Sequence, residues 1–151
     1  LVIMSKYSTL KIGQSSSLVF DSGFDNIKIE EVQNLVITSK FTDVDVEVAV
    51  KKVELEMSYG GFKAENIKNG FEMVKADAKY ASIKLGVEKG TSFYLETEVK
   101  YADISAPEGE LSRLKNTFSE KVYGWIGSNK NSKSKIVANS EYGNVKVSYK
   151  E

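Results

Sequence analysis

The stretch Lys79-Tyr80-Ala81-Ser82-Ile83-Lys84-Leu85 contains a phrase that recurs along the whole chain. An aromatic residue is followed by a small residue, then by an apolar residue, a lysine and a second apolar residue three, four and five places on. Other copies begin at Tyr7, Phe24, Phe41, Tyr59, Tyr101 and Tyr142, with a weaker copy at Tyr123. Successive copies are 17, 17, 18, 21, 21, 22 and 19 residues apart. Near-constant spacing of this kind predicts a repeat architecture.

Each repeat reads as two strands that meet at the aromatic residue. Before it, apolar and polar residues alternate, as in Val53-Glu54-Leu55-Glu56-Met57-Ser58, which is the pattern of a strand with one buried face. After it, the alternation shifts by one position, so that Ile83 and Leu85 become the apolar pair. The small residue between the two strands, such as Gly60 or Ala81, suits a tight bend.

Two architectures fit these repeats, a parallel β-solenoid and an antiparallel meander or barrel. The aromatic position is aromatic in all eight repeats and the position three later is apolar in all eight. Coils that stack in register need such columns of one residue class, whereas a meander does not. We therefore predict a parallel solenoid in which the aromatic residues form a structural column and Tyr59, Tyr80 and Tyr101 are consecutive neighbours.

The Lys-Tyr-Ala/Ser-x-Ile-Lys and Tyr-Gly-x-Val-Lys phrases resemble those of bacterial putative-adhesin repeat proteins, from Leu1 to Val147. The resemblance implies a right-handed, single-stranded β-helix and a place in the cell envelope or at the cell surface, periplasmic or exported. It carries over no catalytic residue, because that group has no well-defined ones. We accordingly expect an all-β, right-handed parallel β-solenoid of about eight coils, forming a single domain over residues 1–151.

The Tyr123 repeat departs from the pattern, because polar residues stand where apolar ones are expected. A slip of one residue there would point Phe118 and Val122 inward instead. The polar residues are Thr117, Ser119 and Lys121.

Composition excludes several kinds of chemistry. The chain has 21 basic and 21 acidic residues and a formal net charge of zero, which argues against a dedicated nucleic-acid binder. It has no His and no Cys, so zinc sites, thiol nucleophiles and histidine acid–base chemistry are excluded. No apolar run approaches the length of a transmembrane helix. We predict no cofactor, no metal ligand and no enzymatic activity.

The sharpest polar feature lies three residues before the aromatic position, where four successive repeats carry Glu56, Asp77, Glu98 and Glu120. Stacked in register, these would form an outward carboxylate column, which a divalent cation or another ligand could occupy. A solvated face, neutralised by nearby lysines, is the simpler interpretation and the one we favour. A glycosidase would need two carboxylates roughly 5–9 Å apart. Acids two residues apart, such as Glu96 and Glu98, arise on any polar strand face and single out no catalytic residue.

Trp125 is the only tryptophan and a further candidate ligand residue. In the regular register it points outward, where it could stack on a sugar ring or a partner. With the slip of one residue it would be buried, and we favour burial.

A second column carries Lys11, Lys28, Lys63, Lys84 and Lys146, interrupted by Asp45. It could hold an anionic polymer, although outward lysines also keep an exposed sheet soluble, which is the interpretation we favour.

The chain opens at Leu1, on a core position without a polar cap. We therefore expect a piece of a longer, processed product, whose N-terminal coil is covered by an upstream segment or another chain. The predicted function is a non-catalytic cell-envelope module, either an adhesin-like binder of a surface glycan or protein, or a scaffold. A polysaccharide-acting enzyme and a purely structural spacer are the alternatives.

Overall fold

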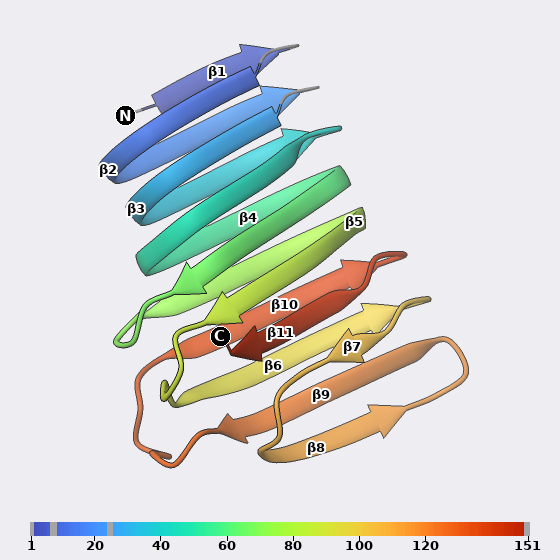
Figure 1. Ribbon diagram of the computed structural model, residues 1–151. Helices are drawn as coiled ribbons and strands as arrows, with labels where there is room; N and C mark the ends of the chain where they lie inside the picture. The colour runs from blue at the N-terminus through green and yellow to red at the C-terminus, as the bar shows by residue number, and fades with distance from the viewer. Residues whose placement is uncertain (1, 7–8, 24–25, 150–151) are drawn as a thin grey trace.

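The computed structural model describes residues 2–6, 9–23 and 26–149, and no described residue is helical, so the all-β prediction is confirmed (Figure 1). None of the described residues forms a helix long and apolar enough to cross a membrane. The strands are β1 (Val2–Lys6), β2 (Thr9–Gly23), β3 (Asn26–Lys40), β4 (Asp43–Ile67), β5 (Met73–Val87), β6 (Phe93–Lys100), β7 (Ile104–Ser105), β8 (Glu110–Lys115), β9 (Ser119–Ile126), β10 (Lys135–Glu141) and β11 (Val145–Tyr149).

The strands β1 to β5 pair in parallel and in chain order. Leu18 of β2 lies opposite Leu35 of β3, Leu35 opposite Val53 of β4, and Val53 opposite Val74 of β5. Residues one repeat apart are therefore direct neighbours across these strands, as the sequence predicts. The long strands turn from one layer of the molecule to the other, which gives the flattened, solenoid-like coils of Figure 1.

The core lies between the two layers and forms one cluster of buried side chains. The layer before the aromatic corner contributes residues such as Leu18 and Leu35, and the layer after it contributes Ile29 and Leu85, all at most 1% exposed. Burying each such side chain stabilises the fold by roughly 1.5–3 kcal/mol. The alternation in the sequence thus decides which side chains face the core.

The order of the coils differs from the prediction at the C-terminal end. Tyr80 and Tyr101 are not neighbours, because β10 and β11 lie between β5 and the β6–β7 coil. Ile136 of β10 pairs with Val74 on one side and with Leu95 on the other. A parallel strand accepts any neighbour with the same alternation, so a shared pattern alone does not dictate which coils adjoin.

The Tyr123 repeat forms no parallel coil. Its strand β9 runs antiparallel to β6 and is joined to β8 as an antiparallel pair, so seven of the eight predicted coils stack in parallel. Val122 is buried, as the predicted slip requires, but Phe118 is 61% exposed and lies against Tyr101. The reversed strand direction places Phe118 at the corner edge instead of in the core.

The predicted aromatic corner is confirmed, and its backbone explains the shift in alternation. Phe41, Tyr59, Tyr80, Tyr101 and Tyr142 have φ between 54° and 60°, a left-handed conformation that bulky residues rarely adopt. Neighbouring rings stack with centroids 4.8 to 4.9 Å apart and planes within 9° of parallel. Stacking of this kind contributes roughly 0.5–1.5 kcal/mol per pair, which offsets part of the backbone strain.

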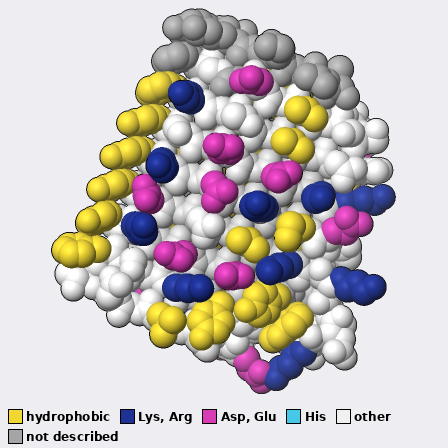
Figure 2. Space-filling view, turned by 180° about the vertical axis from the view of Figure 1, so that it is seen from behind, with side chains coloured by type: hydrophobic (Ala, Val, Ile, Leu, Met, Phe, Trp, Pro, Cys, Tyr) yellow, Lys and Arg dark blue, Asp and Glu magenta, His cyan; other side chains and the backbone are white. Residues whose placement is uncertain are grey.

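The aromatic column stands outside the core. The five rings are 47 to 54% exposed and form a ridge along one edge of the molecule, visible at the left of Figure 2. The ring faces cover one another, so the ridge presents mainly ring edges to solvent. The predicted places of Tyr7 and Phe24 in this column, and of Leu1 in the first coil, lie outside the described residues.

Candidate functional site

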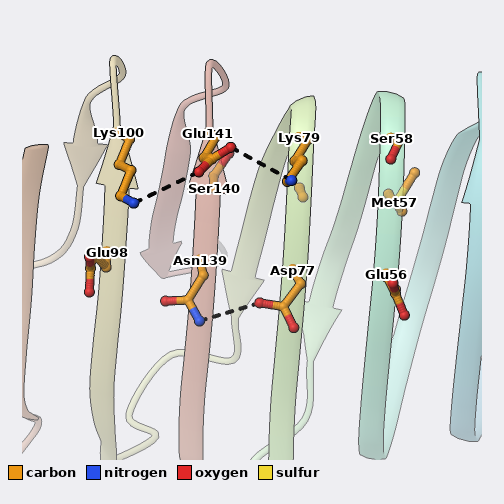
Figure 3. Close-up of a pocket in the computed structure, with 11 residues that line it drawn as sticks. Glu56, Met57, Ser58, Asp77, Lys79, Glu98, Lys100, Asn139, Ser140 and Glu141 are labelled. Atoms are coloured by element: carbon orange, nitrogen blue, oxygen red, sulfur yellow. Dashed lines mark hydrogen bonds and ion pairs between the residues drawn. The ribbon is translucent and has the colours of Figure 1, made fainter. Parts of the chain in front are cut away.

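A groove, called the main groove below, lies on the outer face of the layer that precedes the aromatic corner, beside the aromatic ridge (Figure 3). It has a volume of about 650 Å³ and is open to solvent. Residues of four neighbouring strands line it, and the outward side chains among them alternate along each strand, because side chains on one face of a strand are two residues apart. The lining residues are Glu56, Met57, Ser58, Asp77, Ala78, Lys79, Glu98, Lys100, Asn139, Ser140 and Glu141.

Three of the four predicted carboxylates lie in a row in this groove, on separate strands, in the order Glu56, Asp77, Glu98 (Figure 3). Asn139 of the inserted β10 stands between the last two, and its Nδ2 donates a hydrogen bond to Asp77 Oδ1 at 3.3 Å. The predicted column is therefore interrupted by an amide. No group of three or more metal-binding side chains forms among the residues that the structure describes.

A second row of the groove carries alternating charges. Glu141 lies between Lys79 and Lys100, with its Oε2 4.0 Å from Lys79 Nζ and its Oε1 3.9 Å from Lys100 Nζ. All three side chains are more than a third exposed, and such surface pairs contribute at most about 1 kcal/mol each. The two lysines thus pair with Glu141, an acid that the sequence analysis did not single out.

Glu120 lies outside the groove, so its predicted place in the carboxylate column is wrong. The reversal of β9 puts it opposite Val99 and Lys115 instead of in line with Glu98. Its Oε1 is 3.6 Å from Arg113 Nη1 and its Oε2 is 3.9 Å from Lys115 Nζ. Glu120 therefore joins β9 to β8 through these two ion pairs.

Trp125 lies on the outer face of the sheet, opposite Tyr94, and is partly buried. The two rings meet at 71° with centroids 5.3 Å apart. The outward direction predicted from the regular register is therefore right, and the favoured burial in the core is wrong. Contact with Tyr94 covers part of the indole, and Trp125 remains partly exposed.

Tyr94, Tyr123 and Trp125 together form an aromatic patch beyond the groove, at the end of the stack nearest β8. Lys135 Nζ lies over the Tyr94 ring, 5.6 Å from its centroid, and Lys121 Nζ lies over Tyr123 at 5.8 Å. The sequence analysis did not identify Tyr94 and Lys135 as part of this patch. The inserted β10 brings Lys135 beside Tyr94, and the reversed β9 brings Trp125 beside it.

The opposite outer face carries the lysine column. Lys63 pairs in register with Lys84, and Lys84 with Lys146, beside a groove of about 490 Å³. Lys63 Nζ is 3.5 Å from Glu65 Oε1, so the column is partly neutralised. Its predicted placement is confirmed for these lysines.

The pKa of one corner residue beside the main groove, Tyr142, is raised. Partial desolvation, then the adjacent phenols of Tyr101 and Tyr80 and the Glu141 carboxylate, raise the pKa of Tyr142 above its usual value. Burial likewise raises the pKa of Tyr149, whose hydroxyl donates a hydrogen bond to the Thr91 carbonyl at 2.9 Å. Both phenols therefore keep their protons to a higher pH than an unperturbed tyrosine does.

The profile of the family described as Toastrack DUF4097 matches residues 9–148, which is nearly the whole chain. No curated protein and no solved structure matches the chain.

Proposed function

The chain belongs to the Toastrack DUF4097 family, and we propose that it is a non-catalytic cell-envelope module that binds a surface glycan or protein. The observation that carries this proposal is the outer face with the main groove, where in-register side chains form a regular field of carboxylates, amide and ammonium groups. The resemblance of the repeats to putative-adhesin proteins supports the place in the envelope and a right-handed winding of the coils.

The groove suits an extended polar ligand. Glu56, Asp77, Asn139 and Glu98 offer hydrogen-bonding groups from four neighbouring strands, spaced by the strand separation of about 4.8 Å. A sugar chain carries hydroxyl groups at comparable intervals, and an extended peptide carries backbone amides. The aromatic patch adds an apolar surface beside this row, which both ligand classes use.

The carboxylates favour binding over catalysis. Glycoside cleavage by two carboxyl groups requires different surroundings, so that one is protonated while the other is ionised. Glu56, Asp77 and Glu98 are all exposed on one open face, so this set does not combine a buried carboxyl with an exposed one. This arrangement supports a binding function more than a polysaccharide-acting enzyme.

A purely structural spacer is the second candidate, and the aromatic ridge favours it. Continuous stacking from Phe41 to Tyr101 stiffens the edge of the coils without offering ring faces to a ligand. A spacer needs such stiffness and no specific ligand.

Binding to a panel of surface glycans and envelope proteins tests the proposal. We expect the chain to bind at least one of them, and the variant Glu56→Gln, Asp77→Asn, Glu98→Gln to lose roughly tenfold or more in affinity, as expected for lost hydrogen bonds to charged groups. The matched variant Glu30→Gln, Glu47→Gln, Glu65→Gln on the opposite face should bind as the parent does. Absence of binding across the panel would favour the spacer, and turnover of a glycan that the first variant abolishes would favour the enzyme.

A further inference from the structure

The C-terminal coil, β10 with β11, occupies a gap between two coils that precede it in the chain. The seven residues of β10 pair in parallel with β5 on one side and with β6 on the other (Figure 1). On the second layer, Val145 of β11 pairs with Ile83 of β5 and with Ile104 of β7. The gap is thus a slot with two walls, and the segment Lys135–Tyr149 fills it.

The charged side chains on the outer face of β5 and β6 disfavour direct pairing of these two strands in the absence of β10. Because β5 and β6 share one register relative to β10, direct pairing of the walls would extend the paired Glu56 and Asp77 to a third adjacent carboxylate, Glu98. It would also set Lys79 against Lys100. Like charges directly opposite each other on adjacent strands are destabilising. In the structure, Asn139 separates the two carboxylates and Glu141 separates the two ammonium groups (Figure 3).

Further contacts match the segment to the slot. Ile136, Ala138, Val145 and Val147 are at most 1% exposed, so the inner side of the segment belongs to the core. A Cβ on Gly143 would collide with the backbone of Ala81, so the close approach of this corner to β5 requires glycine. These contacts all lie within the segment and the walls.

The connection between the segment and the rest of the chain is mostly exposed to solvent. Residues 127–134 join β9 to β10 and include a run of exposed polar residues from Ser128 to Asn131. Ser92 holds this connection at two points: its Oγ accepts a hydrogen bond from the Asn129 amide at 3.0 Å, and its carbonyl accepts one from Ser132 Oγ at 2.7 Å. Lys130 also forms an ion pair with Glu110, and Ser134 Oγ donates a hydrogen bond to the Phe71 carbonyl. An identical segment from another copy would therefore make the same contacts inside the slot, which is the condition for exchange between protomers.

We propose that the gap between β5 and the β6–β7 coil is a strand-acceptor site for the segment Lys135–Tyr149, selected by Glu141 between Lys79 and Lys100. A second copy of the chain fills the same site with its own segment when folding takes place at high protein concentration. The product is a dimer formed by reciprocal exchange of the C-terminal coils.

Two full-length variants of opposite charge test the proposal. In the segment variant, Glu141→Lys, the new ammonium group is repelled by Lys79 and Lys100 of its own slot. In the slot variant, Lys79→Glu with Lys100→Glu, the two new carboxylates repel Glu141 of its own segment. Each segment complements the slot of the other variant. After unfolding and joint refolding, we expect roughly tenfold more mixed dimer than exchanged dimer of either variant alone, from several charge contacts that change sign together.

A disulfide reports the exchange directly, because the chain has no cysteine of its own. Lys84 and Lys146 are paired neighbours on β5 and β11, a separation that a disulfide can span. Lys84→Cys is placed in the slot variant and Lys146→Cys in the segment variant, so each chain carries one thiol. Oxidation of the refolded mixture should link the two different chains.

The control is a pair of neutral variants, one chain with Glu141→Gln and the other with both Lys79→Gln and Lys100→Gln. This pair should show no preference for the mixed dimer. The single chain with Lys79→Glu, Lys100→Glu and Glu141→Lys should regain the melting temperature of the parent to within a few degrees. A mixture that stays monomeric without the disulfide, or that forms mixed dimer no more than the neutral pair, would overturn the proposal.

Discussion

The coils from β1 to β5 and the region from β6 to β11 are built from the same repeat, yet they are assembled by different rules. In the first region each strand pairs with the next strand of the chain. In the second, the last coil lies inside the stack and β9 runs antiparallel to β6. The repeat therefore decides which side chains face inward and where the corner lies, but the neighbour of each coil is decided by other contacts. The following predictions address this contrast, from the largest expected effect to the smallest.

The largest effect is expected from the core of the inserted coil. Ile136 is fully buried between Val74 and Leu95, so Ile136→Ala should lower the free energy of unfolding by about 2–5 kcal/mol through lost burial and a cavity. Urea unfolding measures this, with Leu18→Ala of β2 as the matched change in the regular region. If β10 were a loosely attached edge strand, Ile136→Ala would cost less than 1 kcal/mol while Leu18→Ala remained costly.

A smaller effect is expected at the aromatic ridge, which runs through both regions. Tyr80→Ala removes stacking with Tyr59 and Tyr142, so a loss of about 1–3 kcal/mol is expected. The loss is smaller than for Ile136, because the ring is half exposed and leaves no closed cavity. Tyr80→Gly should be less damaging than Tyr80→Ala, since glycine accepts the positive φ of 54°. Equal stability of the Ala and Gly variants would argue against backbone strain at the corner.

A gain in stability is expected where the irregular region buries a hydroxyl. Thr97 is fully buried on β6, and its Oγ1 has no hydrogen-bond partner. The equivalent positions of the regular region hold apolar residues such as Leu55 and Ala76. Thr97→Val should therefore raise the free energy of unfolding by about 1 kcal/mol, measured by urea unfolding. A loss of similar size would instead indicate that the hydroxyl is hydrogen-bonded.

Removing the charge of Glu141 should have a modest effect. Glu141→Gln takes away two exposed ion pairs, so a loss of about 0.2–1 kcal/mol is expected at low ionic strength. The difference from the parent should shrink in 1 M salt, where charges are screened within about 3 Å. A loss that does not change with salt would assign Glu141 a packing role instead of an electrostatic one.

The smallest effect concerns alkaline pH. The raised pKa of Tyr142 means that the folded chain keeps this proton at pH values where the unfolded chain has lost it. Its contribution to stability is therefore complete below the unfolded pKa of about 10 and declines as the pH rises through the folded value. Urea unfolding of the parent and of Tyr142→Phe between pH 8 and 11 measures this, and the Phe variant should lose less stability over that range.

The sequence predicts the regular region well, because period-two alternation and one aromatic corner fix the face and the register of each strand. The inserted coil could not be predicted in the same way, since β10 carries the alternation that β5 and β6 also carry. One signal was present: Glu141 is the only acid directly before a repeat aromatic, where Lys79 and Lys100 stand in two other repeats. The polar residues around Tyr123 marked a disturbed repeat, but they did not indicate that β9 reverses its direction. The groove was therefore predicted in part, through Glu56, Asp77 and Glu98 but without Asn139 and Glu141.

The central claim is that the C-terminal coil separates the β5 coil from the β6–β7 coil in parallel register. Disulfide formation in two full-length double variants tests it most directly. Lys84→Cys with Lys146→Cys joins paired neighbours and should oxidise readily to an intramolecular disulfide. Lys84→Cys with Ser105→Cys spans two coils, because Ser105 pairs with Lys146, and should stay reduced. The opposite outcome, a disulfide between positions 84 and 105 and none between 84 and 146, would contradict the account.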